Sequence, residues 1–334
     1  MQKSFLYIFI IAFIAFIAFV TSSRNRILVI HSYHPEYQWT REITDQINRL
    51  LPSSDIDLTY HYMDTKRNPD QEFKEKAGEE ARRVISEWNP DFIIPVDDNA
   101  QEFVAKYYVG REKPIIIFTG VNAAAERYGY IGAKNVTGIL ERTPVNSIIE
   151  VMQHCFPNAK KFIHLSDSSI TSKLIHNEYH HKDWSPLVCT KALMIDTFDE
   201  WKKEVLAAQG NADFFLYTHY HTIKRSDKIK EIVPPKEIIQ WSINNTKIPG
   251  IGNWGFFVKD GGMMSIAVSA QEQADIPCDY IKKYLKGEPL SSLPIVTTKK
   301  YSVYLNRHRI RQAGVKLPMV YTLLAEISGH VVEK

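Results

Sequence analysis

The sequence has no large excess of either charge and contains only three cysteines among its 334 residues. Its 41 basic and 38 acidic side chains give a formal net charge of +3, which gives no support to nucleic-acid binding. Cys155, Cys189 and Cys278 lie far apart and match no metal-ligand spacing. We expect buried or spare thiols; one disulfide with a leftover thiol is the alternative in an oxidising compartment.

The short motifs of catalysis and of cofactor binding are also absent. The sequence has no Gly-x-Ser-x-Gly, no His-Glu-x-x-His, no phosphate-binding glycine-rich loop and no dinucleotide fingerprint. His180 and His181 are adjacent and so face different ways on a helix, and the histidine pairs in loops are only weakly specific for a metal. Asp97 and Asp98 are candidates for acid–base work, but a helix N-terminus explains them equally well. We therefore predict no cofactor, no metal site and no enzyme, with a hydrolase as the less favoured alternative.

The N-terminus carries the one long apolar run. Lys3 precedes unbroken apolar sequence at residues 5–20, and small residues follow at 21–23. This pattern is typical of a secretory signal peptide, which we assign to residues 1–23. An uncleaved membrane anchor is the alternative, although the run is shorter than the roughly 20 residues that span a bilayer. We expect an exported protein, periplasmic or otherwise extracytoplasmic.

Strand-like and helix-like segments alternate along the rest of the chain. An apolar run at residues 27–30 leads into a polar and aromatic loop and then into a helical pattern at 40–51. The alternation continues through two runs, residues 26–140 and 141–250, each with the size of one domain. Strands that alternate with helices in this way indicate βαβ units with parallel sheets. We therefore predict an α/β protein of two closely coupled lobes.

Polar or aromatic residues follow the predicted strands, where each strand ends in a loop. In parallel α/β sheets, ligands bind beyond the carboxyl ends of the strands. Aromatic rings offer stacking surfaces, hydroxyls and amides offer hydrogen bonds, and helix N-termini offer N–H groups suited to a carboxylate or phosphate. Two lobes whose strand ends face one another make a cleft for a small polar or aromatic ligand. The candidate ligand-binding residues are His31, Ser32, Tyr33, Trp39, Asp97, Asp98, Asn99, Thr119, Gly120, Asn122, Ser166, Asp167, Ser168, Ser169, Thr218, His219, Tyr220, Asn253 and Trp254.

Four segments carry a resemblance to a known family. They read Asn-Val-Thr-Gly-Ile at 135–139, Phe-Pro-Asn-Ala-Lys at 156–160, Lys-Gly-Glu-Pro at 286–289 with Leu-Pro-Ile at 293–295, and Asn306 with Ala-Gly-Val-Lys-Leu-Pro at 313–318. With them the chain resembles the ABC-transporter substrate-binding protein family of the periplasmic-binding-protein type I fold, in its tryptophan-transporter-like group. The resemblance covers residues 26–318. These motifs mark joints of the fold, so they are specific for the fold and weak for the ligand.

The resemblance implies two Rossmann-like lobes joined by a three-crossover hinge, with a small ligand enclosed between them. Lobe 1 is then expected to hold residues 26–140 and about 255–288. Lobe 2 is expected to hold residues 141–252 and about 293–330. The family further implies an ABC permease in the membrane as the partner.

The loop after the first strand departs from this family. His31, Ser32, Tyr33 and His34, followed by Pro35 and then by Trp-Thr at 39–40, are more similar to a loop of related extracytoplasmic sensor domains. Those domains are fused to histidine kinases and cyclic-dinucleotide enzymes. A ligand-sensing module that acts in trans on a membrane sensor kinase is therefore the alternative function.

Overall fold

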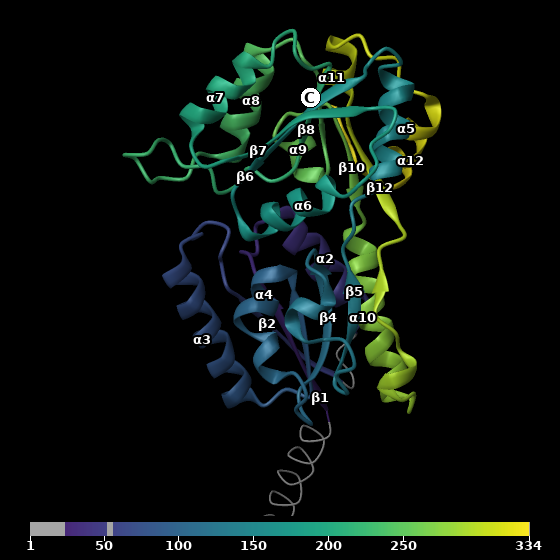
Figure 1. Ribbon diagram of the computed structural model, residues 1–334. Helices are drawn as coiled ribbons and strands as arrows, with labels where there is room; N and C mark the ends of the chain where they lie inside the picture. The colour runs from purple at the N-terminus through teal and green to yellow at the C-terminus, as the bar shows by residue number, and fades with distance from the viewer. Residues whose placement is uncertain (1–23, 52–55, 334) are drawn as a thin grey trace, which may run out of the picture.

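The computed structural model describes residues 24–51 and 56–333, which form two α/β lobes stacked end to end (Figure 1). The expected signal peptide, residues 1–23, lies outside the described residues. Among the helices of the described ranges, none is long and apolar enough to cross a membrane.

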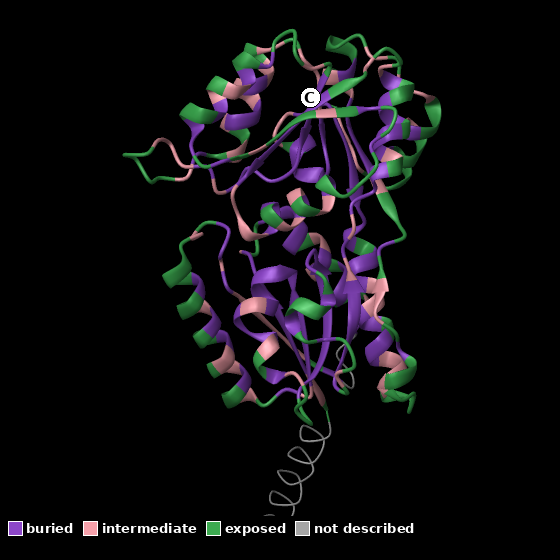
Figure 2. Ribbon diagram, viewed as in Figure 1, coloured by how far each residue is buried: buried purple, intermediate pink, exposed green. Residues whose placement is uncertain are grey.

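Lobe 1 is built on a parallel sheet of order β11-β5-β4-β3-β1-β2. Its central strands are fully buried, as the unbroken apolar runs of a sheet covered on both faces require (Figure 2). Its strands are β1 (Asn25–His31), β2 (Ile56–Tyr62), β3 (Phe92–Val96), β4 (Ile115–Val121), β5 (Val136–Leu140) and β11 (Val296–Thr297). Its helices are α2 (Gln38–Leu50), α3 (Gln71–Trp88), α4 (Asp97–Phe103) and α10 (Ala270–Leu285).

Lobe 2 is built on a sheet of order β13-β12-β10-β9-β8-β6-β7, in which the pair of β10 and β12 is antiparallel and the other described pairs are parallel. Its strands are β6 (Lys161–Asp167), β7 (Val188–Ile195), β8 (Phe214–Tyr217), β9 (Gly250–Gly252), β10 (Met264–Val268), β12 (Tyr301–Asn306) and β13 (Val331–Val332). Its helices are α5 (Val145–Cys155), α6 (Ile170–His180), α7 (Phe198–Ala207), α8 (Pro235–Asn245), α9 (Gly255–Lys259), α11 (Arg307–Gln312) and α12 (Met319–Ile327). The predicted fold class, two Rossmann-like lobes with largely parallel sheets, is confirmed.

The chain passes between the lobes three times: after β5, between β10 and α10, and between β11 and β12. The second passage comes later than we expected. The register pairs Met264 with Ile251 and Ser265 with Tyr304, so α9 and β10 stay in lobe 2 and the return begins at α10 rather than near residue 255. The third passage is also later than residue 293, because β11 still pairs with β5. An apolar strand pattern alone does not say which sheet a strand joins.

One glutamine joins the returning helix α10 to the sheet of lobe 1. Gln273 is fully buried, and its Oε1 accepts hydrogen bonds from Thr119 Oγ1 at 2.8 Å and from the backbone N–H of Gly120 at 2.8 Å. Its Nε2 donates to Thr298 Oγ1 at 2.9 Å in the third passage. Gln273 therefore connects β4, α10 and the last passage between the lobes.

Replacing Gln273 with Ala should lower the free energy of unfolding by about 1–3 kcal/mol, because it leaves the buried N–H of Gly120 without an acceptor and removes the hydrogen bond to Thr298. Gln271→Ala, at an exposed position of the same helix, is the matched control and should change the stability by less than about 0.5 kcal/mol. Urea unfolding of both variants measures the difference. Equal losses in the two variants would contradict the role of Gln273.

Candidate functional site

The loops at the carboxyl ends of the strands of both sheets meet between the lobes (Figure 1). Tyr33, after β1, places its Oη 3.1 Å from Oγ1 of Thr171 in the first turn of α6. Tyr37, just before α2, packs edge-on against His221, with ring centroids 5.1 Å apart, and lies against Phe256 of α9 at 5.8 Å. The two lobes are thus in contact, and the side chains between them are shielded from solvent.

A lysine without a hydrogen-bond partner lies within this interface. Lys66, in the loop after β2, is 3% exposed, and its Nζ makes no hydrogen bond to the described residues. The ammonium lies 4.5 Å from the ring centroid of Tyr33 and 5.7 Å from that of Tyr37. Burial lowers the pKa of Lys66, whereas the carboxylates of Asp167 and Asp97 raise it. A buried, unpaired ammonium is a strong site for an anion, because a counter-ion offsets its lost hydration.

Asp97 offers an acceptor in the same interface. It begins α4 with a φ of 66°, a left-handed conformation that aspartate tolerates better than most residues. Its Oδ1 accepts a hydrogen bond from Trp39 Nε1 at 3.0 Å, whereas its Oδ2 is buried without a partner among the described residues. Burial raises the pKa of Asp97 well above its usual value, and the Lys66 ammonium opposes this. Asp97 can thus receive a donor or a cation.

Asp167, at the end of β6, is fully engaged by its own lobe. Its Oδ1 accepts from Ser169 Oγ at 2.7 Å and from Ser172 Oγ at 2.5 Å, and its Oδ2 accepts from the backbone N–H of Thr222 at 3.1 Å. Burial alone would raise the pKa of Asp167, but the Lys66 ammonium and these hydrogen bonds hold it below its usual value. Asp167 is therefore a fixed negative charge that balances Lys66 at a distance.

Glu141 joins the first passage between the lobes to the other side of the interface. It is buried, and its Oε1 accepts a hydrogen bond from Trp254 Nε1 at 3.1 Å. Burial raises the pKa of Glu141 well above its usual value, and the nearby carboxylates of Asp97 and Asp98 raise it further. Glu141 therefore joins the first passage to Trp254 of lobe 2 through one buried hydrogen bond.

Lobe 2 contributes aromatic rings and two neutral histidines. The rings of His219 and Trp254 have centroids 4.4 Å apart, and those of His221 and Phe256 lie 4.5 Å apart. Burial lowers the pKa of both histidines well below the usual value, and the Lys66 ammonium lowers it further. The Nδ1 atoms of both are buried without a hydrogen-bond partner among the described residues. This wall therefore offers flat apolar surface with neutral polar edges.

A cavity of about 640 Å³ opens between the lobes at this interface, within the size range of small-molecule sites. Lobe 1 lines it with residues that include His34, Tyr37, Lys66 and Arg67, and lobe 2 with residues that include His221, Val233, Phe256 and Asp260. Within the described ranges, no group of three or more His, Cys, Asp or Glu side chains is placed to hold a metal ion.

Many of the residues predicted from strand ends are engaged inside their own lobe. His31 stacks on Tyr62 at 5.3 Å and shares a hydrogen bond with Thr44, on the side of the sheet covered by α2. Asp98 accepts hydrogen bonds from the backbone of Asn122 and Ala123 and so fixes the loop after β4. Hydrogen bonds of the same intralobe kind are made by Ser32, Thr119, Gly120, Ser166, Ser168, Ser169, Thr218 and Tyr220.

Other predicted residues lie in the interface or keep an unused group. Tyr33, Trp39, Asp97, Asp167, His219 and Trp254 make the contacts described above. Asn99, Asn122 and Asn253 each keep a buried side-chain oxygen without a hydrogen-bond partner among the described residues.

Sequence reasoning did not select Lys66, Tyr37, Glu141, His221 or Phe256. One signal was available for Lys66: β2 is a parallel strand like its neighbours, so the loop after it faces the same cleft. The half-exposed alternation of β2 made that strand look peripheral. His221 follows a predicted strand end directly, whereas Phe256 reaches the cleft through the short helix α9, which no strand-end rule indicates.

Comparisons with known proteins agree with this architecture. No curated protein matches the chain. A conserved domain protein from Vibrio cholerae is 15% identical, with a TM-score of 0.68 over 93% of this chain and 100% of its own. An ABC domain from Streptococcus pneumonia in complex with L-Trp is 16% identical, with a TM-score of 0.67 over the same shares of the two chains. A chain in the ligand-free complex of the TorS sensor domain with TorT is also similar. It is 11% identical, with a TM-score of 0.54 over 84% of this chain and 92% of its own.

The sequence itself matches a family model. The model for ABC transporter substrate binding proteins covers residues 55–326, which takes in most of both lobes and all three passages between them. The matched range, the two-lobed fold and the interlobe cleft together place this chain in the ABC transporter substrate-binding protein family.

Proposed function

We propose that this protein is an extracytoplasmic solute-binding protein that encloses a small ligand between its lobes and presents the closed form to an ABC permease. One observation carries the proposal. Lys66 Nζ, Asp97 Oδ2 and the Nδ1 atoms of His219 and His221 are buried at the meeting of the lobes without partners among the described residues. Buried polar groups are normally hydrogen-bonded, so such a cluster is best explained by a ligand that supplies the partners.

The chemistry of the cleft favours a zwitterion with a flat apolar side chain. An anionic group of the ligand would pair with the Lys66 ammonium, and a cationic or N–H group would donate to Asp97 Oδ2. The rings of Tyr33, Tyr37 and Phe256 supply apolar surface beside these charges. An aromatic amino acid combines all three features, and the similar pneumococcal structure holds L-Trp.

Closure of the lobes would couple ligand binding to the partner. Tyr33 with Thr171, Tyr37 with Phe256, and Tyr304 with Glu42 join the lobes directly, the last by a hydrogen bond of 3.2 Å. These contacts require the lobes to be together, so a ligand that adds contacts to both lobes shifts the hinge equilibrium toward the closed form.

A second partner is favoured by the loop after β1. Its resemblance to sensor domains, together with the fold similarity to the TorS–TorT complex, supports a role in trans on a membrane sensor kinase. Purified closed protein should bind either the permease or the periplasmic domain of the kinase, and a pull-down with each separates the two partners.

A thermal-shift screen across amino acids, nucleosides, sugars and organic acids tests the ligand class. A ligand at a hundredfold excess over its Kd stabilises the folded state by about 2.7 kcal/mol, which is readily seen as a rise in Tm. We expect aromatic amino acids to give that rise and Lys66→Met to abolish it. Lys76→Met, at an exposed position of α3, is the control and should leave the rise unchanged.

The ligand-free stability of Lys66→Met separates binding from folding. Because the variant removes an unpaired buried ammonium, its ligand-free Tm should equal or exceed that of the wild type. A lower ligand-free Tm would assign Lys66 a structural role. If aromatic amino acids raise the Tm of Lys66→Met as much as that of the wild type, the proposed anion site is wrong.

A double-mutant cycle tests the closed state. Tyr33→Phe and Thr171→Val each remove the hydrogen bond between the lobes, and each should weaken ligand binding by about 1 kcal/mol, roughly fivefold. The double variant should lose little more than either single variant, because both remove the same contact. Isothermal titration gives the affinities; additive losses would show that the two hydroxyls act separately.

A further inference from the structure

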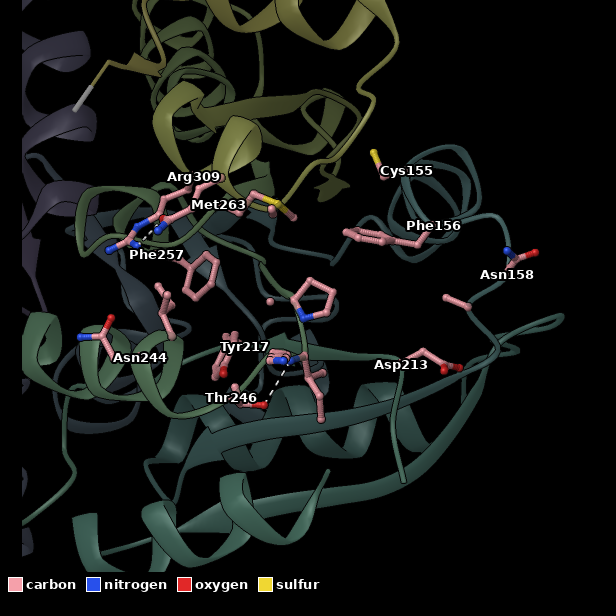
Figure 3. Close-up of a pocket in the computed structure, with 18 of the residues that line it drawn as sticks. Cys155, Phe156, Asn158, Asp213, Tyr217, Asn244, Thr246, Phe257, Met263 and Arg309 are labelled. Carbon is pink, nitrogen blue, oxygen red and sulfur yellow. Dashed lines mark hydrogen bonds between the residues drawn. The ribbon is translucent and has the colours of Figure 1, made fainter. Parts of the chain in front are cut away.

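A second cavity, of about 830 Å³, lies wholly within lobe 2 and away from the interlobe site (Figure 3). It opens where β6, β8 and β9 begin, at the edge of the sheet opposite the cleft, and extends over the sheet between α8 and α11. None of its lining residues lies in lobe 1. The cavity is therefore present whatever the position of the hinge, unlike the cleft between the lobes.

The floor of this cavity is aromatic because β9 carries no side chains there. A Cβ on Gly250 would lie 2.5 Å from the Tyr217 ring, and a Cβ on Gly252 would lie 2.5 Å from Phe257 Cβ. The two rings stack with centroids 5.0 Å apart and an angle of 22° between their planes, over the space that side chains of β9 would fill. Packing fixes both rings, so the floor is rigid and apolar.

The walls combine apolar and polar side chains, and the charged lining residues are Asp213, Lys247 and Arg309. Figure 3 shows Arg309 and Asn244 toward one end of the cavity, Asn158 and Asp213 toward the other, and Phe257 and Tyr217 between them. The remaining walls include Cys155, Phe156, Ile243, Ile248, Pro249 and Met263. A preformed cavity with an apolar body and a few polar groups at its ends has the character of a small-molecule site.

The charged groups at the two ends differ in what they can still bind. Asp213 already accepts hydrogen bonds from the backbone N–H groups of Lys160 and Lys161, each at 2.8 Å. Arg309 donates from its side chain only to Gln312 Oε1, at 2.8 Å, and has no carboxylate partner within the part of the chain that the structure describes. Its backbone N–H is held by Asn306 Oδ1 at the start of α11, which fixes its place. The remaining guanidinium donors suit a carboxylate.

We propose that this lobe 2 cavity is a second ligand site, which binds a monocarboxylate with an apolar body. The carboxylate pairs with Arg309, and the apolar body lies along Phe257 and Tyr217 toward Phe156. The two sites share no lining residue.

Titration of the full chain with decanoate, and with 1-decanol as its neutral counterpart, tests the site. We expect one equivalent of decanoate to bind at least tenfold more tightly than decanol. Arg309→Gln should remove that preference, whereas Arg311→Gln, at an exposed position of the same helix that does not line the cavity, should keep it. Ala313→Trp, which fills the cavity from α11, should abolish binding of both compounds.

Lys66→Met is the control for the interlobe cleft and should bind decanoate like the wild type. Thermal unfolding checks that each variant folds, and Gln312→Trp replaces Ala313→Trp if the latter does not. Equal affinity for decanoate and decanol, unchanged binding in the folded tryptophan variant, or loss of binding in Lys66→Met would each overturn the proposal. A negative result with decanoate would not contradict binding of aromatic amino acids in the interlobe cleft, which the thermal-shift screen tests separately.

Discussion

The closed arrangement of this protein depends on how it accommodates one buried cation, Lys66. Bringing the lobes together removes water from the ammonium without giving it a hydrogen bond from the described residues. The surrounding groups reduce the resulting penalty: Asp167 is held ionised by its own hydrogen bonds, both histidines are held neutral by burial, and two tyrosine rings lie near the charge. These terms do not replace a direct counter-ion. Under the proposed function, an anionic ligand would supply that counter-ion and so favour closure.

The hinge is anchored to lobe 1, and the first turn of α10 does the anchoring. Glu272 Oε2 accepts hydrogen bonds from the backbone N–H groups of Lys299 and Lys300, and Gln273 holds Thr298, so the third passage is bound to α10. Thr298 Oγ1 in turn donates to the carbonyl of Leu140, where the first passage begins. All three passages thus converge on one helix end. If lobe 2 moves, the backbone must bend on the lobe 2 side of these hydrogen bonds. Lys66 and Asp97, both in lobe 1, then keep their relative positions when the cleft opens.

The fold class could be predicted from the sequence because the strands of a buried parallel sheet consist of continuous apolar residues, as at residues 27–30 and 92–94. The site residues were harder to predict, because a polar residue after a strand can either bind backbone groups of its own lobe or face the ligand. Asp98 and Ser32 satisfy backbone groups of their own lobe, whereas Asp97, adjacent to Asp98, keeps one oxygen free. Asp97 has a left-handed φ of 66° and lies close to Gly120, where an added Cβ would come within 3.1 Å of its Oδ1, and an apolar run does not announce this local geometry. Lys66 was missed because its strand looks peripheral, although a parallel neighbour must end at the same edge.

The two cavities differ in what binding can do. The interlobe site is completed by residues of both lobes, so its occupant necessarily prefers the closed form and acts on the hinge. Every wall of the lobe 2 cavity moves with lobe 2, so an occupant there binds the open and closed forms equally unless α11 itself shifts. A ligand with equal affinity for two states does not change their populations, however tightly it binds. Phe256 and Phe257 are consecutive on α9 and line the cleft and the lobe 2 cavity respectively, so α9 is one path for coupling between the sites. A second path runs from α11 through β12, whose Tyr304 donates to Glu42 of lobe 1. Because linkage is reciprocal, any effect of a lobe 2 carboxylate on cleft affinity equals the effect of the cleft ligand on carboxylate affinity.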